Sequence, residues 1–188
     1  MITTLMMTSL LILKIFLKMS KKDLKIYLKG LKKKQLEDQV LDLYDRFKQV
    51  KTFYNFVFKP QEEQLLEEAK FKITKEYFPV GSRKPKARRS VAQNYIKHYI
   101  QLGVDAYVVA EIMLHNIEVA QRYHQKKGVK QETFFKSMLK SFEQAVEYIA
   151  ENQLNDEFNS SMLTIIKTIE NQQWMNAEAF QYLLRKVI

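Results

Sequence analysis

The chain has 188 residues, of which 46% are hydrophobic and 12% aromatic, and this composition excludes a disordered protein. It contains no cysteine, which excludes disulfides, thiolate zinc sites and cysteine nucleophiles and fits a reducing compartment. The formal net charge of +10 predicts an anionic partner, such as nucleic acid or an acidic protein surface. We therefore expect a folded cytoplasmic protein with a basic surface.

The first 18 residues contain an apolar run that invites comparison with a signal peptide. No basic residue precedes the run, no small-residue cleavage site follows it, and Lys14 interrupts it before it reaches the roughly 20 residues that span a bilayer. Immediately after Met19, Ser20 and Asp23 have the spacing of a helix capping box. We therefore expect residues 1–18 to be a non-native upstream extension, and we expect no membrane span.

From Ser20 onward the apolar spacing is helical, and no stretch alternates for long enough to predict a strand. A short first helix begins here, and Gly30 is placed to end it in a left-handed conformation. A second helix follows and continues through an aromatic stretch, residues 53–58, until Pro60 breaks it. Pro60 suits the first position of a third helix, residues 61–78.

Turn and capping residues delimit the remaining helices. The sequence predicts helices over about residues 88–102, 105–127, 131–153, 156–172 and 176–187. Gly103 and Gly128 end two of them, and Asp105 is expected as a side-chain N-cap. Short loops make sequential helices antiparallel neighbours. We therefore predict an all-α fold, an irregular multi-helix bundle or short helical solenoid of about eight helices, in a single domain over residues 19–188.

A basic segment, residues 79–89, separates the third and fourth predicted helices, and no acidic residue lies between Glu76 and Asp105. Its cations are Arg83, Lys84, Lys86, Arg88 and Arg89. If all five contacted phosphates, binding would weaken with salt with a log-log slope of roughly 3.5 to 4.5. We expect them to stay free of intramolecular carboxylates and to bind an anionic partner, most concretely nucleic acid. The alternative is a solvated linker whose charges pair with acids of the third and sixth helices.

Charge is unevenly distributed between the two ends of the chain. Lys32, Lys33 and Lys34 belong to a lysine-rich N-terminal stretch, whereas the charged residues of the segment 141–170 are mostly acidic. We expect both of these charged stretches to be solvated helix faces. Two functional interpretations remain beside that one. The three lysines add to a nucleic-acid surface, or the apolar and acidic face of the last three helices makes the protein a helical adaptor for a protein partner.

A narrow stripe on the fifth helix contains Glu111, His115 and Glu118, which are the ligand types of a carboxylate-histidine metalloprotein. The stripe is also the one polar side of an apolar helix and is expected to face water. The helical di-iron pattern needs Glu three residues before His on two helices, and here His115 precedes Glu118. We therefore expect no metal and no other cofactor, and we keep the metalloprotein as a third alternative.

The common signatures of enzymes, GxGxxG, GxxxxGK[ST], HExxH and GxSxG, are absent, so we expect a non-enzymatic binding protein without catalytic residues. The aromatic stretch, with Phe53, Tyr54, Phe56 and Phe58, lies between lysines. Such interleaving suits base stacking, but an all-helical protein more often uses these side chains in its core. We expect core packing, with Tyr54 as the member nearest the surface.

Several segments together resemble a bacterial family of small helical proteins of unknown function. They are residues 20–31, 41–48, 67–73, 77–79, 90–93, 96–98 and 102–105. The resemblance covers most of the chain after Met19, implies Met19 as the start, and implies no catalytic or binding residues. In leucine spacing, the first two helices and the lysine-rich turn 29–34 also resemble two-helix nucleic-acid-binding modules of the SAP type.

Overall fold

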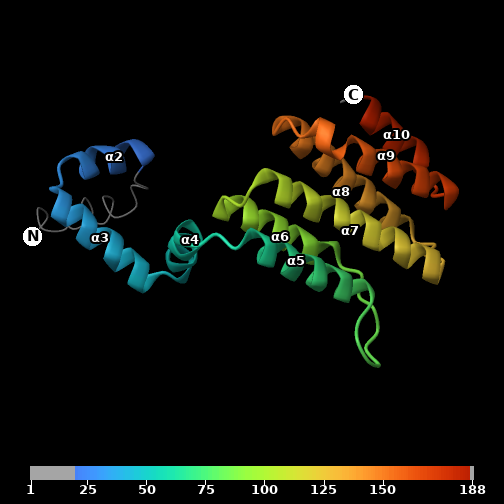
Figure 1. Cartoon of the computed structure of the whole chain (residues 1–188), viewed down its shortest axis with the longest axis horizontal. Helices are drawn as coiled ribbons and strands as arrows, with labels where there is room; N and C mark the ends of the chain where they lie inside the picture. Colours follow the sequence, from blue (N-terminus) through green and yellow to red (C-terminus); the bar gives the residue numbers. More distant parts are fainter. Residues whose placement is uncertain (1–19, 187–188) are drawn as a thin grey trace, which may run out of the picture. The chain divides into compact units, whose positions relative to one another are not determined.

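The computed structural model describes residues 20–186, and these residues contain nine helices, α2 to α10, and no strand (Figure 1). The all-α prediction is confirmed, with one helix more in this part of the chain than the eight expected. The proposed extension, residues 1–18, lies outside the described residues. The chain forms two compact units, residues 1–58 and 59–188, whereas the sequence analysis expects one domain. Each unit is described by itself below.

The N-terminal unit contains α2 (Lys21–Lys29), α3 (Lys33–Arg46) and α4 (Lys48–Phe58). The predicted capping box is present, because the Asp23 amide donates to Ser20 Oγ at 3.2 Å and the Ser20 amide donates to Asp23 Oδ2 at 3.0 Å. Gly30 is the C-cap, but its φ of −82° is right-handed, so the expected left-handed conformation is wrong. Hydrogen bonds of the three-residue type close this turn instead.

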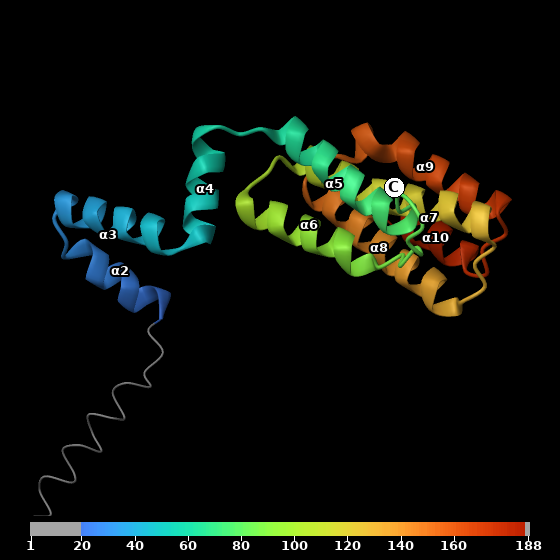
Figure 2. The same ribbon diagram turned by 90° about the horizontal axis from the view of Figure 1, so that it is seen from below.

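Phe47 divides the predicted second helix into α3 and α4. Its backbone is extended, with φ −118° and ψ 112°, and α4 departs from the direction of α3 (Figure 2). Because the apolar pattern continues through Phe47 and no glycine or proline stands nearby, the sequence carries no signal for this break. The long second helix is therefore two helices joined at one residue.

The aromatic stretch of α4 is not part of a core, and that prediction is wrong. No residue of α2, α3 or α4 is buried, and Phe58 is 79% exposed. Tyr54, expected nearest the surface, is instead one of the more covered members, because its ring packs against Phe53, Phe58 and Tyr44. In the described part of this unit, residues 20–58, three short helices leave these side chains on the surface.

The C-terminal unit contains α5 (Glu62–Tyr77), α6 (Arg89–Leu102), α7 (Ala106–Lys127), α8 (Glu132–Glu151), α9 (Asn155–Asn171) and α10 (Ala177–Arg185). Its central element is α7, which contacts α5, α6, α8 and α9 (Figures 1 and 2). Apolar side chains cover most of its circumference, as a helix surrounded by others requires, and Ile112 and Ile117 are completely buried. This core fixes the neighbouring helices α5 and α6, which carry the candidate site.

The helix ends of this unit follow the sequence closely. Gly103 and Gly128 are left-handed C-caps, with φ values of 82° and 59°. Asp105 Oδ1 accepts from the Tyr107 amide at 2.8 Å, which is the predicted N-cap of α7. At α5 the N-cap is Gln61, so Pro60 precedes the cap rather than occupying the first helical position.

No helix in residues 20–186 has both the length and the apolar content that a membrane crossing needs.

Candidate functional site

The basic segment is a loop that joins two antiparallel neighbours, α5 and α6. It begins after α5 ends at Tyr77, and its last residue, Arg89, is the first of α6. Figure 1 shows it extending beyond the ends of the helices that it connects. The predicted interruption of the helical pattern at this place is therefore present, and it exposes most of the segment to solvent.

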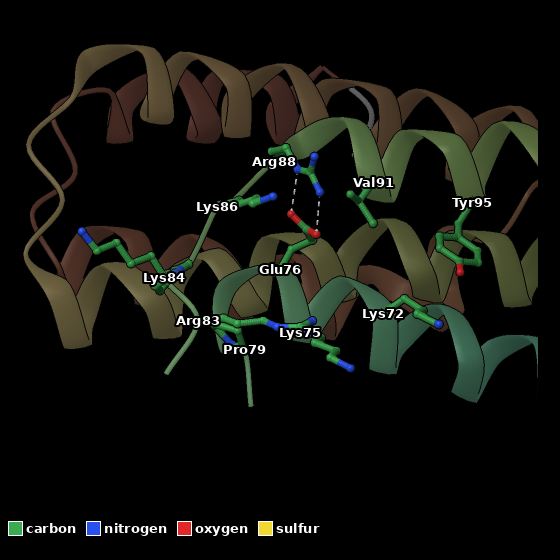
Figure 3. Close-up of a pocket in the computed structure, with 11 residues that line it drawn as sticks. Lys72, Lys75, Glu76, Pro79, Arg83, Lys84, Lys86, Arg88, Val91 and Tyr95 are labelled. Atoms are coloured by element: carbon green, nitrogen blue, oxygen red, sulfur yellow. Dashed lines mark hydrogen bonds and ion pairs between the residues drawn. The ribbon is translucent and has the colours of Figure 1, made fainter. Parts of the chain in front are cut away.

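The two ends of this loop are held together at Glu76. The main-chain oxygen of Glu76 accepts from the amides of Lys86 and Ala87, both at 3.1 Å. Its carboxylate accepts two hydrogen bonds from Arg88, from Nε and from Nη2, each at 2.9 Å (Figure 3). Ala87 has a φ of 47°, a conformation that L-residues rarely adopt and that costs roughly 1–2 kcal/mol. These bonds hold the loop in this fixed form.

The expectation that all five cations stay free of carboxylates is wrong for Arg88. Glu76 is the last acid before the acid-free stretch, and the return of the loop brings Arg88 back to it. This hydrogen bonding lowers the pKa of Glu76 and raises the pKa of Arg88. Arg88 therefore supports the loop rather than offering a free charge.

Within residues 20–186 Arg89 pairs with no carboxylate, but neutral groups of α8 occupy two of its donors. Its Nε donates to Ser141 Oγ at 2.7 Å and its Nη2 to Gln144 Oε1 at 2.5 Å. The guanidinium is partly buried, and this desolvation lowers the pKa of Arg89. Arg89 thus ties the first turn of α6 to α8 and is not among the residues that line the cavity described next.

Arg83, Lys84 and Lys86 line one cavity of about 630 Å³ together with side chains of α5 and α6 (Figure 3). We call this cavity the basic pocket. Its lining residues are Lys72, Lys75, Glu76, Pro79, Arg83, Lys84, Pro85, Lys86, Arg88, Val91 and Tyr95. Its size lies within the range of small-ligand sites in proteins.

The sequence analysis missed Lys72 and Lys75, although α5 presents them to the pocket on the same side as Glu76. Their spacing contains the signal, because residues three and four apart lie on one face of a helix. That face leads into the basic segment, so Lys72 and Lys75 lie beside the predicted cations. The sequence analysis overlooked these two lysines because the helix has an amphipathic pattern and carries charges of both signs.

The basic pocket is strongly positive. Six cations and one carboxylate line it, which gives a formal charge of +5. Among the residues that the structure describes, the only ion pair in the pocket joins Arg88 to Glu76, so five cations have no carboxylate partner. Ion pairing within the protein therefore leaves most of this charge available to an anion.

Lys32, Lys33 and Lys34 belong to the N-terminal unit, whereas the basic pocket is formed within the C-terminal unit. The Lys32 amide donates to Gln35 Oε1 at 2.8 Å at the start of α3. Lys33 Nζ lies 3.7 Å from Glu37 Oε1 in an exposed pair that contributes little. All three side chains are exposed, so they remain a second group of surface cations.

The sequence analysis expects the carboxylate-histidine stripe of α7 to face water. In the structure, side chains of α5 contact it. Lys70 Nζ lies 2.6 Å from Glu111 Oε1, and Thr74 Oγ1 lies 3.0 Å from His115 Nε2. Burial lowers the pKa of His115 to about 4. Within residues 20–186 no group of three or more potential ligands could hold a metal ion. The stripe gives no support to the metalloprotein alternative.

Replacing Glu76 by glutamine is expected to make binding of anions to the basic pocket tighter and unfolding less dependent on pH. Because the pKa of Glu76 is lowered in the folded protein, its contribution to stability is present above about pH 4.5 and is lost as the pH falls through the folded value. Because glutamine does not titrate, Glu76→Gln abolishes this loss of stability at low pH. The substitution also raises the formal charge of the pocket by one. Urea unfolding between pH 7 and pH 3, and phosphate or oligonucleotide titration at neutral pH, measure the two effects.

The matched control for this variant is Glu132→Gln, which removes the carboxylate of an exposed ion pair with Lys136 outside the pocket. It is expected to bind anions like the wild type. A Glu76→Gln protein with lower anion affinity and an unchanged circular dichroism spectrum would contradict the assignment of Glu76 as the one opposing charge of the pocket.

Comparison with known proteins identifies a family but no function. Neither a curated protein nor a solved structure matches the chain. The model of a family of unknown function, DUF6155, matches residues 19–187, which includes both the basic segment and the lysines of the N-terminal unit. The resemblance recognised in the sequence is thereby confirmed, and the chain belongs to the DUF6155 family.

Proposed function

We propose that this protein is a non-enzymatic nucleic-acid-binding protein that holds phosphates in the basic pocket. The observation that carries the proposal is a set of five cations around one cavity that pair with no carboxylate in the described part of the chain, Lys72, Lys75, Arg83, Lys84 and Lys86. Phosphates are the anions that such clusters of Lys and Arg neutralise, with release of counterions as the driving force. The lack of cysteine favours the cytoplasm as the place where this happens.

The distribution of the cations favours a polymer over a single small anion. The five come from both the α5 helix and the projecting loop, so they line the pocket and its rim rather than converge on one point (Figure 3). One phosphate group accepts only a few charge-assisted hydrogen bonds at a time. A chain of phosphates uses all five, and the net charge of +10 attracts it from a distance. The exposed Lys32, Lys33 and Lys34 offer a second contact to the same polymer.

The salt dependence of binding tests this proposal. With five phosphate contacts, the log-log slope against salt is expected to be about 3.5 for a single strand and about 4.5 for a duplex. A variant with Arg83, Lys84 and Lys86 replaced by glutamine loses three contacts, and its slope is expected to fall by about 2 to 3. Fluorescence anisotropy with labelled oligonucleotides at several salt concentrations measures both slopes.

The matched control removes three exposed lysines of the same unit that lie outside the pocket, Lys127, Lys130 and Lys167. It lowers the net charge by the same amount and is expected to change the slope much less. Equal slopes for the pocket variant, the control and the wild type would show that the pocket does not contact phosphates, and the proposed function would be wrong.

A helical adaptor for a protein partner is the second candidate, and one observation favours it. A cavity of about 440 Å³ beside α6, α7 and α8 combines apolar side chains, among them Ile96 and Met113, with Glu147 and Glu151. Of the last three helices, to which the sequence analysis assigns an acidic and apolar surface, α8 contributes to this cavity. A partner that stays bound after nuclease treatment, and that is released when Glu147 and Glu151 are replaced by lysine, would favour this candidate.

A further inference from the structure

The basic pocket has two chemically different ends. Figure 3 shows Lys84 at one end and Tyr95 at the other, with the Glu76–Arg88 pair and Val91 between them. The cations of the loop therefore gather at the first end. At the second end Tyr95 donates to Glu68 Oε1 at 3.5 Å, and Lys72 of α5 also lies near this end, so it carries one charge of each sign (Figure 3).

The Tyr95 end presents an aromatic ring beside aliphatic surface. Tyr95 is half-buried, and packing against Tyr99, with ring centroids 5.8 Å apart, fixes its ring. Burial raises the pKa of Tyr95, with the Glu68 charge adding to the effect, so the side chain stays neutral. An aromatic ring held in a cavity beside aliphatic surface from Val91 is the kind of platform on which nucleobases stack.

The neutralised centre separates these two ends. Arg88 and Glu76 cancel each other through two hydrogen bonds, so the middle of the pocket carries little net charge. A ligand that fits must carry negative charge at one side and an uncharged flat group at the other. One nucleotide of a nucleic-acid strand has this composition, since its phosphate and its base lie on opposite sides of the sugar.

We propose that the basic pocket binds single-stranded nucleic acid by taking up one unstacked nucleotide, with its base against Tyr95 and its phosphates against the loop cations. This inference rests on the proposed function and adds the substrate class to it. In a duplex the base is paired and stacked inside the helix, so it reaches such a platform only after unpairing. The remaining cations, Lys72 and Lys75 on α5, contact the phosphates of neighbouring nucleotides.

Three probes of about ten nucleotides test the inference, because single-strand sites of this kind cover a few to some sixteen nucleotides. They are labelled oligothymidylate, an abasic strand with the same phosphates, and a duplex of the same length. The wild-type protein is expected to bind oligothymidylate about tenfold more tightly than the abasic strand, which is the effect of roughly one stacked base. It is also expected to prefer oligothymidylate to the duplex. Thymidine monophosphate is expected to compete only weakly, since it lacks the neighbouring phosphates.

The Tyr95→Leu variant is expected to lose that tenfold advantage while binding the abasic strand like the wild type, and Tyr95→Phe is expected to keep it. The comparison of the two strands on the wild-type protein needs no variant, so it stands even if Tyr95→Leu folds poorly. Equal affinity for oligothymidylate and the abasic strand, or for the duplex, would overturn the inference. If the glutamine variant of the three loop cations still changes the salt slope, the proposed function survives; if it does not, both are wrong.

Discussion

Phe142→Ala is expected to lower the free energy of unfolding of the C-terminal unit by about 3–5 kcal/mol. Phe142 lies on α8, is completely buried, and packs against Phe180 of α10 with ring centroids 5.2 Å apart. Removing the ring exposes no compensating polar surface and leaves a cavity, since the neighbouring helices relax only partly. Such a loss is a large part of the total stability of a domain of this size.

The measurement is urea unfolding followed by far-ultraviolet circular dichroism, which reports on the helices of both units, and by the fluorescence of Trp174, the only tryptophan in the chain. Trp174 is 3% exposed and lies 5.9 Å from the Phe180 ring, so its emission reports on this core. The matched control is Phe58→Ala, which removes the same side chain from a position that is 79% exposed. We expect this control to change the stability by no more than about 0.5 kcal/mol. A control as damaging as Phe142→Ala would mean that α4 has a packed partner.

Acidification from pH 6.5 to pH 4 is expected to destabilise the C-terminal unit by about 3 kcal/mol through His115 alone. Burial holds the pKa of this imidazole at about 4, with the charges of Lys70 and Arg122 adding to the effect. The unfolded chain binds this proton below about pH 6.5 and the folded protein only below about pH 4. The contribution of neutral His115 to the stability of the folded protein is therefore complete above pH 6.5 and is lost as the pH falls from 6.5 to 4.

The variant that tests this is His115→Gln, which keeps a hydrogen-bonding group near Thr74 but cannot be protonated. Its unfolding free energy is expected to fall much less between pH 6.5 and pH 5, where most carboxylates stay ionised. The control is His98→Gln, a change on the exposed face of α6 that leaves His115 in place. A wild-type protein whose stability stays constant over this range would show that His115 takes up its proton without cost.

Local chemistry made several features of the fold predictable. The Ser20 and Asp23 box, the Asp105 cap and the left-handed Gly103 and Gly128 depend on residues next to one another in the chain. The break at Phe47 was not predictable, because no residue at this position has a distinct backbone preference that would end a helix. Gly30 shows the converse, since a glycine permits a left-handed turn without requiring one.

The candidate site divides in the same way. Composition identified the basic segment of eleven residues. It does not show which of the five cations will pair with an acid or form hydrogen bonds to a neighbouring helix. Folding brought Glu76 to Arg88 and α8 to Arg89, and it added Lys72 and Lys75 from α5 to the remaining three cations. Pairing depends on distance in space, and the side chains that met here lie as far as 55 residues apart.

By itself, the sequence determined that the described chain is helical, where most of its helices begin and end, and that the lysine-rich N-terminal stretch and the loop before α6 are both rich in positive charge. Periodicity, caps and composition are local properties, so a linear reading reaches them. Only the tertiary structure decided which aromatic residues are buried, that α7 is the central helix, and which cations remain unpaired around a pocket with Tyr95 at its far end. Burial and ion pairing are set by which surfaces meet, and that is a property of the packed helices together.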